Sequence, residues 1–290
     1  LEIENCEKTI PDSLLVLKAY KKWGQNFVDH LLGDYSIAIW DKLKKVLVLV
    51  TDHMGIRPIF YCKTDKHFIF ATEIKGIFAT DLIAKCLNKS FLATNIVLPT
   101  AMIVLPEETF FENIFAMTTA AIIITNSVTI CKKRDWKAND RKKLYFKTED
   151  EWIEAFQDLF FKAVNARMRS DFNISALLSG GLDSSSIVAT ANQILGRQNK
   201  KLHTLSAVLP DNYKGEGTDE RYYIDQFKAF ENIDMHYIVV DETSGPFDNP
   251  EKLVYGGEVP FYTSRHYLYT SFCKIAKSLD SRIILDGIFS

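Results

Sequence analysis

The chain is 290 residues long, carries a formal net charge of -2 and contains 47% hydrophobic residues. This length usually corresponds to two domains, each large enough to bury its own core. The near-neutral charge gives no electrostatic basis for a nucleic-acid or membrane surface, and no apolar run approaches the roughly 20 residues that span a bilayer. We therefore expect small-molecule substrates, with neither nucleic acid nor membrane as a partner.

The cysteines predict a reducing environment. There are five of them, an odd number without C-x-x-C spacing, which does not suit a complete disulfide framework. A cytoplasmic location is the expectation for such a chain. The sequence starts at Leu1 without an initiating methionine, so we expect it to be an excerpt of a longer chain.

The first half of the chain predicts one helix followed by antiparallel hairpins. Asp12 is a candidate cap for a helix that continues to Trp23 and ends at Gly24. Short apolar runs separated by charged or glycine-bearing turns predict strands that form an antiparallel sheet. These strands are expected at 35–40, 46–50, 59–61, 68–70, 120–125 and 128–132, with a short helix at 73–78.

The composition changes at residues 132–143, which are almost wholly polar. We expect a first domain at 1–134, a linker at 135–148 and a second domain at 149–290. The second domain alternates helices with strands, which predicts a doubly wound parallel sheet with ligands at the carboxyl ends of its strands. Strands are expected at 173–178, 202–208, 235–240 and 282–285, and helices at 187–195, from about 219 and at 262–279; Trp152, Phe156, Phe160 and Val164 recur on a further long helix.

A glycine turn between the strand at 173–178 and the following helix predicts a phosphate site. Gly180 and Gly181 allow positive φ and close backbone approach, while the N–H groups of the new helix favour an anion. Ser179 and Ser184 add hydroxyl donors, and Asp183 offers a carboxylate that suits Mg²⁺ on a polyphosphate.

The turn contains no lysine of the P-loop type, which argues against phosphoryl transfer by a P-loop NTPase. Ser-Gly-Gly-Leu-Asp-Ser-Ser at 179–185 instead resembles the pyrophosphate loop of the ATP pyrophosphatase superfamily. Members of that superfamily cleave ATP between its α and β phosphates. The resemblance implies ATP and Mg²⁺ as cofactors, with Asp183 as a metal ligand.

Both halves together resemble the glutamine-hydrolysing asparagine synthetases. The segments Gly33–Asp41, Asp52–Tyr61 and Ala71–Lys75 are similar to successive signatures of the amidotransferase domain of that family, and the loop at 179–185 follows in the family's order. The resemblance implies an α+β amidotransferase domain of the N-terminal nucleophile type, incomplete here, followed by an α/β synthetase domain. It implies adenylation of a carboxylate, with nitrogen supplied by glutamine or ammonia, and aspartate and glutamine as substrates.

The resemblance also assigns individual residues in the first domain. Thr9–Asp12 is similar to a T-x-S-D segment, so Asp12 would bind the α-amino group of glutamine, although a helix cap is an equally simple interpretation. The family's nucleophile is a cysteine at residue one, and we expect it to lie before Leu1 or to be absent. Cys6 lies too close to the helix at Asp12 to replace it, and His53 is expected to be structural.

At the other end, Leu285-Asp286-Gly287-Ile288 aligns with a family segment that reads Leu-Ser-Gly-Glu. Asp286 and Gly287 would contribute to the ATP site, as would Leu178 and Ala207 at positions that line the adenine pocket; the last two could equally be plain sheet residues. The Leu-Asp-Gly form is closer to relatives that close lasso peptides or β-lactam rings. A second acidic ligand for Mg²⁺ is expected beyond Ser290.

Three interpretations of the function therefore remain open. The first is an ATP-dependent ligase of asparagine synthetase type, for which a homodimer is one expected state. The second is a cyclase that takes a precursor peptide or an amino-acid derivative and uses a substrate amine as nucleophile. The third is a non-catalytic nucleotide-binding relative. Other pyrophosphatase-superfamily enzymes, such as tRNA thiolases or GMP synthetases, are disfavoured by the signatures at 33–41 and 52–61 and by the absence of paired cysteines.

Overall fold

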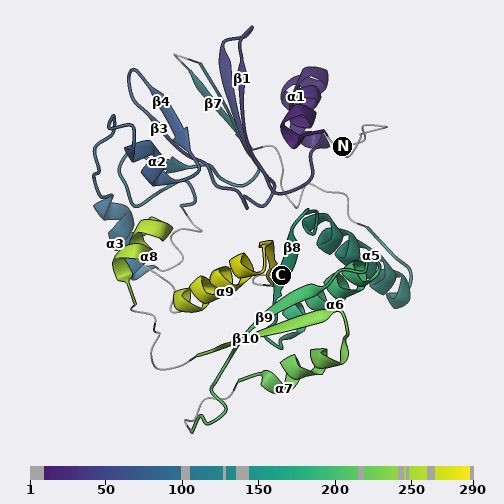
Figure 1. Ribbon diagram of the computed structural model, residues 1–290. Coiled ribbons are helices and arrows are strands. Elements are labelled where there is room, and N and C mark those ends of the chain that lie inside the picture. The colour runs from purple at the N-terminus through teal and green to yellow at the C-terminus, as the bar shows by residue number, and fades with distance from the viewer. Residues whose placement is uncertain are drawn as a thin grey trace. The chain divides into compact units, whose positions relative to one another are not determined.

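The computed structural model (Figure 1) describes residues 10–98, 105–126, 129–134, 144–214, 219–240, 245, 248–259 and 265–287. The chain forms two compact units. The first comprises Leu1–Lys143 and Glu258–Pro260, and the second comprises Leu144–Gly257 and Phe261–Ser290. The domain limits at 134 and 149 stay a prediction. Among the described residues, no helix combines the length and the apolar character needed to cross a membrane.

The first unit starts with the expected helix, α1 (Asp12–Trp23), and a 3-10 helix, η1 (Gly24–His30), follows it. Gly24 ends α1 with a φ of 61°, as predicted from its lack of a Cβ. The capping role predicted for Asp12 is wrong. Pro11 occupies the N-cap position in an extended conformation, its carbonyl accepts from the Leu14 N–H at 3.0 Å, and Asp12 becomes the first helical residue.

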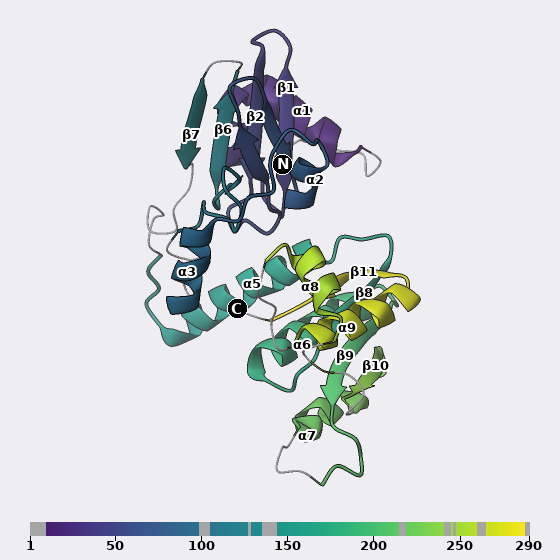
Figure 2. The ribbon, with the colours of Figure 1, turned by 90° about the vertical axis from the view of Figure 1, so that its left-hand side faces the viewer.

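The strands of the first unit pair in antiparallel hairpins, as expected, but they form two sheets instead of one. In the first sheet the order is β1-β2-β6-β7, and these strands run side by side in Figure 2. The second sheet has the order β4-β3-β5. The strands are β1 (Ser36–Asp41), β2 (Val46–Thr51), β3 (Phe60–Lys63), β4 (Phe68–Ala71), β5 (Phe115–Ala116), β6 (Ala121–Thr125) and β7 (Ile130–Arg134).

A shared apolar cluster joins the two sheets. Leu49 and Ile123 from the first sheet pack with Tyr61 from the second and with Ile59 just before it. Between the two sheets the chain turns at Gly55, whose φ is 68° and where a Cβ would come within 2.9 Å of the Thr119 side chain. The sequence predicts a glycine-bearing turn at this place but not that the strands on its two sides belong to different sheets.

Two helices complete the described part of this unit. The expected short helix is α2 (Ile74–Phe78), whereas α3 (Lys89–Val97) was not predicted. Asn88 caps α3 by accepting from the Phe91 N–H at 3.0 Å. Only Phe91 and Asn95 of α3 are buried, so its apolar residues show no helical stripe that the sequence could reveal.

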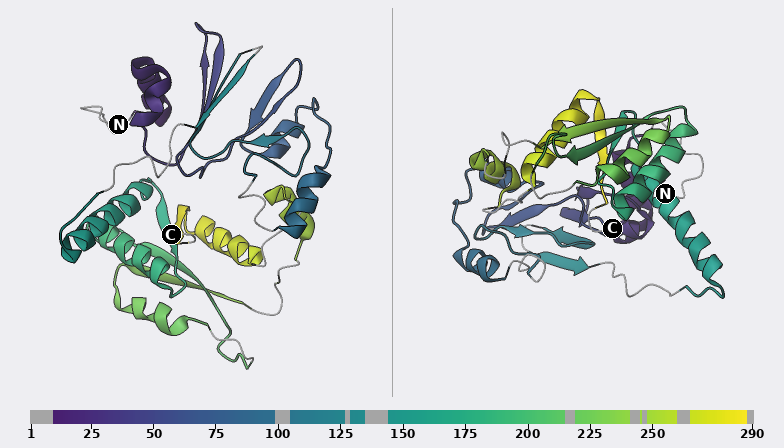
Figure 3. Two further views of the ribbon diagram at one scale, coloured as in Figure 1. Left: turned by 180° about the vertical axis from the view of Figure 1, so that it is seen from behind. Right: turned by 90° about the horizontal axis from the view of Figure 1, so that it is seen from below.

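The second unit contains the predicted parallel sheet, with the strand order β10-β9-β8-β11; Figure 3 shows it from two further sides. The strands are β8 (Asn173–Leu177), β9 (Leu202–Val208), β10 (Ile233–Val239) and β11 (Ser281–Leu285). The helices are α5 (Glu149–Arg167), α6 (Leu182–Gly196), α7 (Arg221–Ile224), η3 (Asp225–Ala229), α8 (Pro250–Gly257) and α9 (His266–Ser278).

Helices cover both faces of this sheet. Val164 of α5 and Val188 of α6 belong to one core cluster with Ile174 and Leu202 of the sheet. On the other face, Phe272 and Ala276 of α9 pack against Leu205 of β9. The chain passes from β8 to β9 to β10 in one direction and then returns to place β11 on the free side of β8. The strand order therefore reverses beside β8, where sheets of this kind bind ligands.

The long helix predicted from Trp152, Phe156, Phe160 and Val164 is α5, and only part of this apolar stripe is buried. Val164 is buried and Phe160 packs against the core, but Trp152 is 49% exposed and Phe156 is 66% exposed. The recurrence of apolar residues at every fourth position correctly predicts the helix, because this spacing follows from the helical repeat and needs no knowledge of neighbouring elements. It does not tell how far along the helix the sheet extends.

Candidate functional site

The loop after β8 takes the shape that its two glycines predict. Gly180 has a φ of 83°, and a Cβ there would lie 3.0 Å from the Cβ of Glu220 and 3.1 Å from that of Tyr223. Position 180 therefore excludes a side chain both by conformation and by space. Gly181 is the N-cap of α6 and makes no side-chain capping hydrogen bond.

The two serines hold the loop in this shape. The buried Ser184 Oγ accepts from the Ser179 N–H at 3.2 Å, donates to the Gly181 carbonyl at 3.2 Å and lies 3.0 Å from the Ser179 Oγ. The Gly181 N–H lies 3.4 Å from the same Ser179 Oγ. The Ser179 and Ser184 hydroxyls, which the sequence predicted as ligand donors, thus also form hydrogen bonds that stabilise the loop.

The N-terminus of α6 presents the features of an anion site. The first-turn N–H groups of a helix have no partner within the helix, and no side chain caps those of α6. The helix is 15 residues long, so its dipole favours negative charge at this end. Asp183 is exposed in the first turn, and its carboxylate is of the type that could hold a cation beside such an anion.

The ends of the neighbouring strands complete the edge of the sheet. Leu178 is 1% exposed; its N–H donates to the Leu205 carbonyl at 3.0 Å and its carbonyl accepts from the Ser206 Oγ at 2.7 Å. Ala207, half-buried, is the next residue of β9. The structure thus holds Leu178 and the end of β9 together, as expected for parallel neighbours.

Asp286 and Gly287 follow β11 and reach the same edge. A Cβ at Gly287 would lie 3.1 Å from the Ser184 backbone nitrogen and 3.3 Å from the Asp183 Cβ, so the backbone of Gly287 lies against the first turn of α6. Burial raises the pKa of Tyr269 above its ordinary value, and the negative charge of Asp286 raises it further. Ile288, Thr9 and Cys6 lie outside the described residues.

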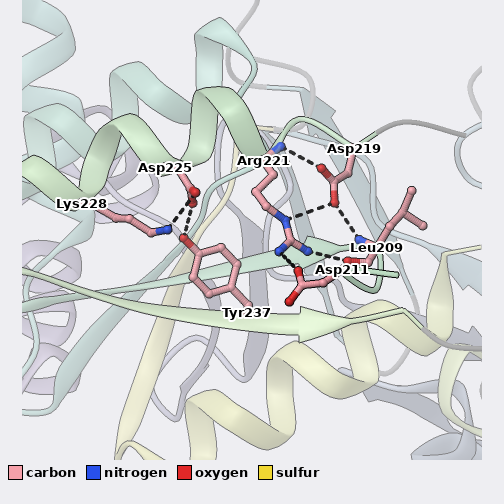
Figure 4. A network of polar contacts seen from close by, with 7 residues as sticks. All are labelled: Leu209, Asp211, Asp219, Arg221, Asp225, Lys228 and Tyr237. Carbon is pink, nitrogen blue, oxygen red and sulfur yellow. Dashed lines mark hydrogen bonds and ion pairs between the residues drawn. The ribbon is translucent and has the colours of Figure 1, made fainter. Parts of the chain in front are cut away.

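Arg221, for which no role was predicted from the sequence, forms a network of polar contacts with residues around the end of β9 (Figure 4). Arg221 opens α7 and binds Asp211 and the Leu209 carbonyl just after β9, and its Nε lies 3.6 Å from Asp219. Asp219 accepts from the Leu209 N–H at 2.7 Å and the Arg221 N–H at 3.1 Å. Burial opposes the ionisation of Asp219, but these hydrogen bonds and the charge of Arg221 hold its pKa below the ordinary value. The run Asp219-Glu220-Arg221 before a helix was the available signal.

In the first unit the signature at 52–61 forms a structural turn. Asp52 is 1% exposed, and its carboxylate accepts from the N–H groups of Tyr35, Met54, Ile56 and Arg57 at 2.9–3.3 Å. His53, next to it, borders a small cavity together with Tyr35 and Thr51. Asp12, exposed at the start of α1, belongs to this unit and not to the edge of the parallel sheet.

Comparison with protein families matches both halves of the chain. The glutamine amidotransferase domain matches residues 3–136, and the asparagine synthase domain matches residues 155–289. Among relatives, the putative asparagine synthetase [glutamine-hydrolyzing] 2 of Methanocaldococcus jannaschii is 31% identical over 255 residues, which are 84% of this chain and 47% of the relative.

Of two further relatives, one is also named an asparagine synthetase and the other an amidase. The asparagine synthetase [glutamine-hydrolyzing] 2 of Bacillus subtilis is 26% identical over 97% of this chain and 38% of its own length. The amidase chry2 of Gibberella zeae is 26% identical over 80% of this chain and 35% of its own length. The chain thus spans between about a third and a half of the length of each of these three relatives. With both domains present in this order, the chain belongs to the glutamine-hydrolysing asparagine synthetase family.

Proposed function

We propose that the protein is an ATP-dependent ligase in which this chain supplies the nucleotide site. A carboxylate oxygen attacks the α phosphate of ATP and displaces pyrophosphate, and an amine or ammonia then attacks the acyl carbon and displaces AMP. The first step is needed because an amine cannot displace a carboxylate oxygen, whereas AMP is a good leaving group. The observation that carries the proposal is the glycine loop joined to an uncapped helix N-terminus, without a lysine.

The residues of the loop fit Mg-ATP. The backbone of Gly180 and Gly181 and the first-turn N–H groups of α6 would hold the departing pyrophosphate, with Ser179 and Ser184 keeping the loop in shape. Asp183 would hold Mg²⁺, which neutralises charge on the phosphates. Leu178 and Ala207 would border the adenine, and Asp286 and Gly287 would close the site from β11.

The finer features of the two domains are part of the proposal. We assign the first unit to the N-terminal nucleophile type of amidotransferase, with Asp12 binding the α-amino group of glutamine, and the second to the ATP pyrophosphatase type. The domain limits 1–134 and 149–290, a cytoplasmic location and a homodimer remain predictions. The aspartate and glutamine of the named asparagine synthetases are the first substrates to test.

The role of Asp183 gives the central experiment. In the full-length protein, Asp183→Asn should slow substrate-dependent pyrophosphate release by at least about 100-fold, since an electrostatic contact to the reacting charge is worth roughly 3 kcal/mol. Asp158→Asn, which removes an exposed ion pair with Lys162, serves as the matched control. ADP as the product, or a fully active Asp183→Asn, would contradict the proposal.

A second candidate, a peptide or β-lactam type cyclase, is favoured by Asp286 and Gly287 directly after β11. The amidase name of a relative likewise shows that similar proteins are not all named for asparagine synthesis. Full-length enzyme with ATP, aspartate and either ammonia or glutamine should form asparagine if the first candidate is correct. Pyrophosphate release only with a peptide or amino-acid derivative would establish the cyclase instead.

A further inference from the structure

A cluster of two histidines and one aspartate lies at the opposite end of the parallel sheet from the glycine loop. His203 is the second residue of β9, and Asp234 and His236 lie on β10, where Asp234 is the register partner of His203. All three side chains are on the same sheet face, because register partners and residues two apart on a strand point the same way. Among the described residues, no other group of three His, Cys, Asp or Glu side chains has metal-ligand geometry.

The three ligand atoms converge on one point. His203 Nδ1 lies 3.1 Å from Asp234 Oδ2 and 3.3 Å from His236 Nε2, and His236 Nε2 lies 3.3 Å from the same Asp234 oxygen. In a tetrahedral site with metal–ligand distances of about 2.0–2.1 Å, neighbouring ligand atoms are about 3.3–3.4 Å apart. An octahedral site of the same size would place them about 3.0 Å apart. The cluster therefore has nearly the spacing of three corners of a tetrahedron.

From this geometry we propose that His203, Asp234 and His236 bind Zn²⁺, with the fourth position open to water. Two imidazoles and a carboxylate form a donor set that Zn²⁺ takes in proteins. The side chains are 12%, 45% and 24% exposed in the order of the chain, so the site is both sheltered and accessible to an ion. Without a metal, two ring nitrogens and one carboxylate oxygen face one another and can be bridged only by the protons of the imidazole rings. A bound metal would contact all three atoms directly.

The site is separate from the proposed ATP loop. Val208 lies five positions after His203 on β9, which at the rise of an extended strand is about 16 Å, and the glycine loop lies at the Val208 end. The metal joins β9 to β10, which is at one edge of the described sheet. Bound metal would tie this edge strand to β9, while its open fourth position distinguishes the site from a closed structural zinc site.

The test is a Zn²⁺ titration of the purified chain by calorimetry, together with its thermal unfolding. The unchanged chain should bind one equivalent, and its Tm should rise with Zn²⁺. His203→Gln, Asp234→Asn and His236→Gln should each weaken binding at least about 100-fold and remove the rise in Tm, since even changes next to metal ligands cost 10–100-fold. His67→Gln, at an exposed hairpin residue of the first unit, should behave like the unchanged chain.

Co²⁺ supplies a second measurement that does not depend on stability. A tetrahedral site gives intense visible absorption, which should appear with one equivalent of Co²⁺ and disappear in Asp234→Asn, a nearly isosteric change at a half-exposed side chain that leaves the fold intact. Binding below one equivalent, or a site that persists in all three variants, would overturn the proposal. In that case the cluster is a hydrogen-bonded group only, or the metal is bound by the cysteines.

Discussion

At the scale of the residue, Gly180 and Gly287 are the positions of the candidate site where the backbone leaves least room for a side chain. Gly180 faces Glu220 and Tyr223, and Gly287 faces the backbone of Ser184. The sequence predicts the first from its place between a strand and a helix. The contact of Gly287 with α6 joins residues about a hundred positions apart, and only the structure shows it.

Gly180→Ala should weaken ATP binding at least about 10-fold and lower the free energy of unfolding by about 1–3 kcal/mol. The alanine would be strained at a φ of 83° and would press against Glu220 and Tyr223. Binding is measured by calorimetry and stability by urea unfolding. Gly256→Ala is the matched control, because Gly256 lies in α8 with open space around its Cβ position and the change should be neutral or stabilising. Unchanged ATP affinity in Gly180→Ala would exclude the loop as the nucleotide site.

Polar residues with structural roles are harder to recognise in the sequence. Asp52 belongs to a segment that resembles a family signature, yet its carboxylate is occupied by four backbone N–H groups. No role was predicted for Arg221 from the sequence, yet it binds three partners beside the end of β9. The same residue types serve both roles, and the surrounding backbone decides between them.

At the scale of the element, apolar spacing predicts helices and strands well where the spacing is set within the element and not by its neighbours. The residues of β9 were predicted as found, and α1 was predicted with its end at Trp23 but with Asp12 as cap instead of first helical residue. Helices α3 and α8 were missed because few of their residues are buried. The exposure of Trp152 and Phe156 on α5 could not be predicted from their spacing, because burial depends on what packs against the helix.

Strand β10 and helix η3 are joined by a hydrogen bond that should make stability depend on alkaline pH. Tyr237 donates to Asp225 at 2.6 Å, and burial together with this bond raises the pKa of Tyr237 from 10.0 to about 12. A raised folded-state pKa adds stability that is fully present below pH 10 and is lost as the pH rises toward about 12.

In Tyr237→Phe this contribution is absent. The variant should therefore be less stable than the unchanged chain at pH 9, and the difference should shrink as the pH approaches 12, in urea unfolding at each pH. Tyr222→Phe, at a side chain that is 74% exposed, should leave the pH profile unchanged. A constant difference between the unchanged chain and Tyr237→Phe across this range would show that the pKa of Tyr237 is not raised.

At the scale of the whole molecule, each unit has apolar clusters of its own residues. Those of the first unit are centred on β2, β3 and β6, and those of the second on the parallel sheet. A chain of this length was expected to contain two such cores. The length of the chain did not predict the order of the strands within each unit.

Leu205→Ala should test whether each core stabilises its own unit. Leu205 is 1% exposed between β9 and α9, and its truncation should cost about 2–5 kcal/mol. Hydrogen exchange should then accelerate at the amides of β8, β9, β10 and β11, while the amides of β1 and β2 keep their protection. Equal acceleration in both sets of strands would show that the two cores unfold as one.

The sequence alone determined the features that depend on neighbouring residues. A glycine pair between an apolar run and a helical pattern favours a tight turn at a helix N-terminus, so the shape of the loop at 179–185 was predictable, while its phosphate ligand stays a prediction. The alternation of helices and strands determined a parallel sheet in the same way, because parallel strands require crossover connections.

Tertiary structure alone decided which distant residues meet. The return of β11 to the side of β8 brings Gly287 to Ser184, and the pairing of β9 with β10 brings His203 to Asp234 and His236. No local pattern contains these contacts, because the choice of a strand's neighbour depends on the burial of whole faces and not on its own residues. For this reason the loop could be found in the sequence, whereas the histidine and aspartate cluster became visible only in the folded sheet.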